Sequence, residues 1–198
     1  MKLVQQVSPN PLPNMEGKTR CILGRNFLVP QKRETMSDSV RVKLRDVRFR
    51  NLEDAVKEAE QLLVSGYIQR GKWTLGQICS HCREVQEFSL HGSPRWMSLF
   101  AFVRPFYRMA LLPRLLRGES PIGMPTAPAL VPAPNLDDQF EVEAFASSVD
   151  QLMHHPGEYF PHPGFGQLGR EGLLELYTAH ASHHFRFLEP CSAHPPEA

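Results

Sequence analysis

The sequence predicts an all-α protein, and three observations support this fold class. Apolar residues recur in five segments at the three- and four-residue spacing of one helix face. Capping residues precede several of these segments, and Gly or Pro follows them. No segment shows the alternation of a convincing strand. Each helix would bury one apolar stripe, so we expect a helix bundle with an additional short helical segment and long loops.

The first two helices are marked by their ends. Asn51 can cap a helix that ends at Ser65–Gly66. Thr74 and Gln77 form a capping-box pattern at the start of a second helix, which runs to about Leu90.

Three further helical segments follow. We expect the third from Met97 to Leu116, kinked near Pro105 because proline breaks the helical hydrogen-bond ladder. After a Pro-rich loop over 121–134, Asn135 is the expected cap of the fourth helix, and His154 lies at its end. A Gly/Pro/aromatic loop over 158–169 then leads to the last helix, from about Arg170 to Leu188.

The ends of the chain lack this periodicity. Residues 1–40 are expected to be a disordered extension, with Met36 as an alternative start. Residues 41–190 form the predicted domain, and 191–198 a loose tail. The run at 41–50 alternates weakly between apolar and charged residues, so it predicts either a short strand or an extended lead-in.

Composition excludes several classes of protein. The net charge of +1 gives no reason to expect nucleic acid as a partner, and the basic excess belongs to the first 50 residues. Four cysteines in 198 residues do not make a disulfide scaffold, so a reducing cytoplasm is the expected location. Arg and Pro residues interrupt the most hydrophobic stretch, Trp96 to Leu116, which predicts no membrane span.

Three histidines are the candidate metal ligands. His180 and His184 are four residues apart, so both rings point from the same face of the last helix, within an otherwise apolar stripe. His81 interrupts a similar stripe on the second helix. Three imidazoles suit Zn(II), with Ni(II), Co(II), Mn(II) and Fe(II) as alternatives, and leave a coordination position open. The alternative is that these are core histidines hydrogen-bonded to carbonyls.

Three motifs carry a resemblance to a known family. The segments are WTLGQICSH at 73–81, HPGFGQL at 162–168 and HASHHFRFL at 180–188. Together they resemble the DUF1569 family, within the DinB/YfiT-like superfamily of metalloenzymes, over about Asp46 to Pro190. The chain departs from that pattern at Gly169, where a Thr cap is expected, and at Leu173, where Trp is expected.

The resemblance implies a fold and a function. It implies a four-helix bundle with one divalent metal on His81, His180 and His184. It also implies a small-molecule substrate and a transferase or hydrolase reaction that could use a low-molecular-weight thiol. Homodimers are common in that superfamily. The alternative function is a non-catalytic binding or dimerisation module, because no clear general acid or base accompanies the histidines.

Other residues have a functional and a structural interpretation. Cys79 and Cys82 have the spacing of a redox motif, in which the reactive cysteine lies at a helix start. Because both lie inside the predicted helix, we expect them to be buried thiols that pack in the core. His183 is rotated about 100° from His184, so it is expected at the surface or beyond the ligands. The remaining candidates are pocket-bordering or outer groups, namely Gln77, Glu84, His154, His155 and His162, and an arginine-rich segment with Arg104, Arg108, Arg114 and Arg117.

Overall fold

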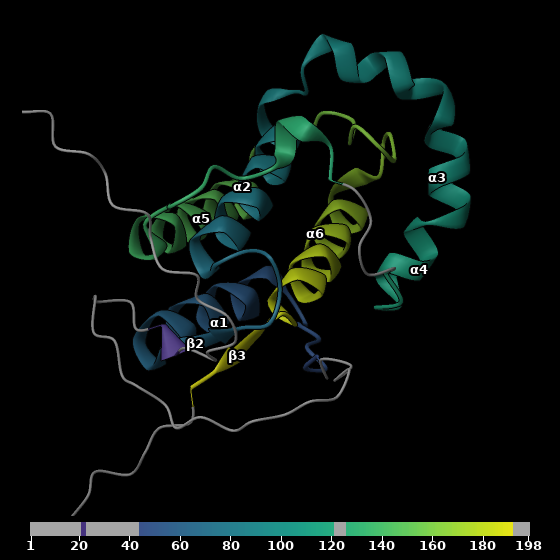
Figure 1. Cartoon of the computed structure of the whole chain (residues 1–198). Coiled ribbons are helices and arrows are strands. Elements are labelled where there is room, and N and C mark those ends of the chain that lie inside the picture. Colours follow the sequence, from purple (N-terminus) through teal and green to yellow (C-terminus); the bar gives the residue numbers. More distant parts are fainter. Residues whose placement is uncertain (1–20, 23–43, 121–125, 192–198) are drawn as a thin grey trace, which may run out of the picture.

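A computed structural model describes residues 21–22, 44–120 and 126–191, and in this part the chain is mostly helical, as expected (Figure 1). The four long helices are α1 (Leu52–Ser65), α2 (Leu75–His91), α5 (Asp138–Met153) and α6 (Gly169–Phe185). None of the described helices is long and apolar enough to cross a membrane.

The core lies where the four long helices pack together. α2 packs along α5 and contacts α6, while α1 contacts α5, α6 and α2. Each helix contributes side chains that water barely reaches, for example Leu62 of α1, Ile78 of α2, Phe145 of α5 and Phe185 of α6. Burial of such apolar stripes is the main favourable contribution to folding. It also fixes which face of α2 meets α6, and so where His81 points.

The expected helix ends are largely confirmed. The Asn51 side chain accepts a hydrogen bond from the backbone N–H of Asp54 (2.8 Å), and Thr74 with Gln77 forms a complete capping box. The prediction for α5 is wrong by two residues. Asn135 has a φ of 59°, and the carboxylate of Asp137 caps the helix by accepting from Phe140 N (2.8 Å).

A small antiparallel sheet corrects the expectation that the chain has none. Its order is β1 (Cys21–Ile22), β2 (Tyr67–Gln69), β3 (Leu188–Pro190), with Ile68 opposite both Cys21 and Glu189. Leu188 therefore belongs to a strand and not to the last helix, which ends at Phe185. Gly66 makes this pairing accessible, since its φ of 73° turns the chain out of α1 directly into β2.

The chain ends are described only in part. β1 lies inside the predicted disordered extension and pairs with β2, whereas 1–20 and 23–43, with Met36, lie outside the described residues. Cys191 follows β3 and is disulfide-bonded. This bond differs from the expectation of a reducing location, where disulfides are rare. Residues 192–198 of the predicted tail also lie outside the described residues. The lead-in at 44–49 has no regular secondary structure, which excludes the strand alternative for these residues.

The third predicted helix is broken into three short pieces. A 3₁₀ segment, η1 (Arg95–Val103), leads into α3 (Arg104–Ala110) and α4 (Leu112–Leu116). Pro105 and Pro113 each lie in the first turn of a new helix, where a missing N–H has no cost. Figure 1 shows these pieces as an arch that leaves the packed helices and returns beside α6 at α4. We call residues 95–118 the arm.

Candidate metal centre

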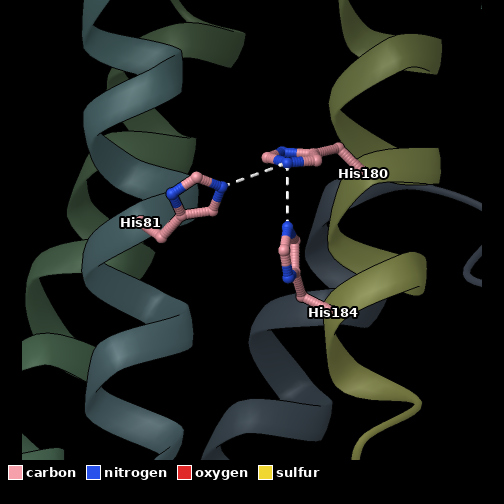
Figure 2. Close-up of side chains that lie close together, drawn as sticks. All are labelled: His81, His180 and His184. Carbon is pink, nitrogen blue, oxygen red and sulfur yellow. Dashed lines mark hydrogen bonds between the residues drawn. The ribbon is translucent and has the colours of Figure 1, made fainter. Parts of the chain in front are cut away.

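The three predicted histidines come together between α2 and α6 (Figure 2). His81 lies in the row of α2 that contains buried Ile78 and Val85, so packing of this row brings its ring toward α6. His180 and His184 are one turn apart on α6 and point back toward α2. One candidate ligand nitrogen from each ring lies within 4.8 Å of the other two.

Close distances join the Nε2 atoms of the three rings. His180 Nε2 lies 3.3 Å from His81 Nε2 and 3.0 Å from His184 Nε2. Two imidazole nitrogens bound to one tetrahedral zinc ion, each at about 2.0–2.1 Å, would be about 3.3 Å apart. Both distances are close to this value, and the third pair, His81 and His184, lies within 4.8 Å, so the group is compact enough for one shared metal ion.

The orientation of His81 is fixed from outside the group. Its Nδ1 lies 2.9 Å from the carbonyl oxygen of Leu130, which belongs to the 3₁₀ turn η2 (Pro128–Leu130) in the Pro-rich loop. A carbonyl can only accept, so we assign the proton of His81 to Nδ1. Nε2 is then left with its lone pair toward the centre, the tautomer that a ligand histidine needs.

No arrangement of protons gives both contacts of His180 their own hydrogen bond. A ring nitrogen holds either one proton or one lone pair in the ring plane. His81 Nε2 is an acceptor, so His180 Nε2 would have to donate to it. The same proton would then face His184 Nε2 as well. A cation placed among three lone pairs satisfies all three nitrogens together, and the donor set therefore fits a divalent metal better than a hydrogen-bonded cluster.

Burial keeps the three rings in their neutral form. It is the first cause that lowers the pKa of His81 and lowers the pKa values of His180 and His184 well below the usual histidine range. Mutual repulsion between the imidazolium forms lowers the pKa values of His180 and His184 further. Neutral imidazole is the form that binds a metal, so the site is ready for a metal at neutral pH.

Trp73 forms an apolar wall beside the centre. Its ring stacks on His184, with centroids 5.3 Å apart, and tilts against His81 at 4.8 Å. The indole lies just before the α2 capping box, so the start of that helix determines its place. His81 is buried, whereas His180 and His184 are each partly exposed.

Two groups at the site were not found from the sequence. Trp73 belonged to the family motif, but nothing in a single sequence assigned its ring to two histidines. Leu130 contributes a backbone carbonyl from a loop, and a backbone carbonyl has no signature in residue types. Both depend on how α2 packs, which spacing alone does not give.

The two cysteines lie on a different face of α2. Cys79 and Cys82 are free and fully buried. Burial raises the pKa of Cys79 well above its usual value, with Asp138 and Glu141 of α5 among the further causes, and it raises the pKa of Cys82 to about 12. Both thiols stay protonated and hidden, which supports the packing interpretation over redox chemistry.

The remaining candidates lie outside the histidine group. Gln77 caps α2 and donates to the carbonyl of Ala133 (3.1 Å). Glu84 is half-buried, and its pKa is raised first by burial. His183 is rotated away from the ligands, as expected, and its ring packs between His184 and Phe187. Leu173 is buried in the core, and Gly169 begins α6 without a side-chain cap.

The loop histidines and three of the four candidate arginines have structural partners. His162 accepts from Gly164 N (3.1 Å) and stacks on Phe165, which fits a role in loop geometry, and burial lowers its pKa to about 4. His154 Nδ1 lies 3.1 Å from a carboxylate oxygen of Asp150, and the ring of His155 packs on the ring of Tyr159. Arg104 and Arg108 donate to backbone carbonyls, and Arg117 pairs with Glu119.

Comparison with known families agrees with the sequence motifs. The model of a family described as a protein of unknown function, DUF1569, matches residues 41–191. The chain belongs to the DUF1569 family. No curated protein and no solved structure matches it. The three histidines and Trp73 all lie inside the matched range, so the candidate metal centre is part of the family domain.

Proposed function

We propose that this DUF1569 protein is a metal-dependent enzyme of the DinB/YfiT-like kind, with one divalent metal on His81, His180 and His184. The observation that carries the proposal is the convergence of three Nε2 atoms for which no proton arrangement satisfies every contact. Four long packed helices, with one ligand on α2 and an i, i+4 pair on α6, support the superfamily assignment.

The donor set supports the reaction class that we propose. Three neutral imidazoles leave a coordination position open, and no carboxylate joins the group among the described residues. A divalent metal bound there supplies a Lewis acid that activates water or holds a thiolate at neutral pH. We therefore propose a transferase or hydrolase with a small-molecule substrate, zinc as the first candidate metal and a low-molecular-weight thiol as the candidate co-substrate.

The residues around the centre have distinct roles in this proposal. The Leu130 carbonyl holds the proton of His81 on Nδ1 and so keeps Nε2 available as a ligand. Trp73 covers one side of His81 and His184 and limits the approach of water there. The partly exposed side of His180 and His184 is left as the approach for a substrate.

Metal content of purified protein tests the proposal. We expect about one equivalent of zinc or nickel by inductively coupled plasma mass spectrometry, and none in the His81→Ala/His180→Ala/His184→Ala variant. His154→Ala is the matched control, since His154 is an exposed histidine outside the group. Equal metal content in the triple variant and the wild type would overturn the site.

A non-catalytic binding module is the second candidate function. The observation that favours it is the lack of an acid or base beside the histidines within the described residues. Protein with full metal content that neither binds nor turns over low-molecular-weight thiols would favour the module. Saturable binding of a thiol that depends on His180 would favour the enzyme.

A further inference from the structure

The arm exposes an apolar face that no other part of the described chain covers. Phe102, Phe106 and Met109 are 79%, 63% and 76% exposed. They are separated by four and three residues, the spacing of one helix face, although Phe102 belongs to the 3₁₀ segment. Trp96 and Tyr107, 45% and 41% exposed, add two more aromatic rings to the arm. Exposed apolar groups gathered on one element mark an interaction surface.

The opposite face of the arm is fastened to the protein. Arg104 Nε donates to the carbonyl of Pro163 and Arg108 Nη1 to that of Gln167, each at 2.9 Å. Leu111, Leu112 and Leu115 pack against the core at the end of the arm. The arm is thus held by arginines on its inner side, and its aromatic side faces outward. This is the reverse of the usual amphipathic surface helix, which turns its apolar side inward.

The charge of the arm identifies the kind of partner. Residues 95–118 contain five arginines and no Asp or Glu. Arg95 and Arg114 are exposed, and neither forms an ion pair with the described part of the chain. Glu119, directly after the arm, pairs with Arg117, and Arg114 also lowers its pKa, so one carboxylate stands against five arginines. An apolar face beside this excess of positive charge matches an anionic lipid surface, where aromatic rings enter the interface and arginines meet phosphates. Trp and Tyr are the residues most enriched at that boundary.

We propose that the arm docks onto an anionic lipid surface, with Phe102, Phe106 and Met109 inserted at the interface and Arg95 and Arg114 against the headgroups. Nucleic acid fits less well, because Arg104 and Arg108 are turned to backbone carbonyls and do not form a track of free cations. A two-fold contact between two arms through this face would offer Arg95 and Arg114 no anionic partner, because the arm contains no Asp or Glu. The proposal does not depend on the metal centre, whose three histidines lie outside the arm.

Co-sedimentation with vesicles tests the proposal. We expect the full chain to bind vesicles of phosphatidylglycerol and phosphatidylcholine, and to bind pure phosphatidylcholine far more weakly. The Phe102→Ser/Phe106→Ser/Met109→Ser variant should lose affinity by at least about tenfold. Arg95→Gln/Arg114→Gln should lose about fivefold per arginine. Raising the salt concentration to about 1 M should weaken wild-type binding, since headgroup attraction is screened.

Matched variants separate the arm from the rest of the surface. Val64→Ser/Phe140→Ser removes exposed apolar groups on α1 and α5, and Lys57→Gln/Lys72→Gln removes exposed charges elsewhere. Both should bind vesicles like the wild type. Equal wild-type binding to neutral and anionic vesicles, or no binding, would overturn the proposal. So would an arm variant that loses self-association or oligonucleotide binding while vesicle binding is unchanged.

Discussion

Helix α2 carries two sets of reactive side chains on different faces, and they have different fates. Cys79 and Cys82 turn into the core, where Asp138 and Glu141 of α5 influence Cys79. His81, one residue before Cys82, turns toward His180 and His184 of α6. The two cysteines have the spacing of a redox motif, whereas His81 is a single candidate ligand whose i, i+4 partners lie on α6. The helix packed against each face, and not the spacing, decides whether a side chain meets partners or apolar atoms.

Single alanine substitutions at two neighbouring residues of α2 should give the largest difference in metal content between its two faces. His81→Ala should abolish metal retention, because it removes one of three ligand nitrogens. Cys82→Ala should retain the wild-type metal content, because this thiol is buried away from the group. Metal analysis of the two single variants, beside circular dichroism to confirm folding, measures the contrast. Loss of metal in both variants would mean that the two faces share one site.

The buried cysteines should react slowly with thiol reagents, and the stability of the protein should depend on pH through Cys82. A pKa of about 12 for Cys82, against an ordinary 9, lowers the thiolate fraction near neutral pH by about 10³-fold. Because the folded pKa is raised, the neutral thiol contributes stability below about pH 9, and this contribution is lost as the pH rises toward 12.

The rate of modification by a thiol reagent measures this protection. The Cys79→Ala/Cys82→Ala variant gives the background from the other cysteines. Rates above that background should be at least about 10³-fold lower in folded than in unfolded protein. Rapid modification of either thiol in folded protein at neutral pH would contradict the assignment of this face to the core.

Trp73 tests how much the surroundings of the histidine face matter. Trp73→Ala removes the ring that packs on His81 and His184, so we expect metal affinity to fall about 10- to 100-fold. Trp73→Phe keeps an aromatic wall and should stay near the wild-type affinity. A competition titration with a chelator measures both variants. Unchanged affinity in Trp73→Ala would show that the histidine rings keep their positions without the indole.

Much of the fold follows from local chemistry that the sequence displays. The caps at Asn51 and Thr74, the break near Pro105 and the i, i+4 pair on α6 all depend on residues within a few positions of one another. Local rules also place His81 on an apolar row. They are sufficient to predict which three histidines form the candidate site.

What remained unpredicted depends on contacts between distant segments. The β2–β3 pairing joins residues more than a hundred positions apart, and Leu188 therefore left the expected helix for a strand. The Leu130 carbonyl reaches His81 from a loop 49 residues away. Asn135 has a positive φ and does not cap α5. Asp137, two residues later, is the cap instead. Each case is decided by tertiary packing or backbone conformation that residue type alone leaves open.

The smallest effect is expected at the N-terminal cap of α2, which both faces of the helix have in common. Thr74 accepts from Gln77 N, and Gln77 in turn accepts from Thr74 N. Thr74→Ala removes the hydroxyl and should lower the free energy of unfolding by about 1 kcal/mol. Thr74→Ser keeps the hydroxyl and is the matched control in a urea titration. His81 lies two turns further along α2, so metal content should stay at the wild-type value in both variants. Loss of metal in Thr74→Ala alone would mean that fraying of the first turn, beside Trp73, reaches the histidines, and that the two faces are less independent than their packing indicates.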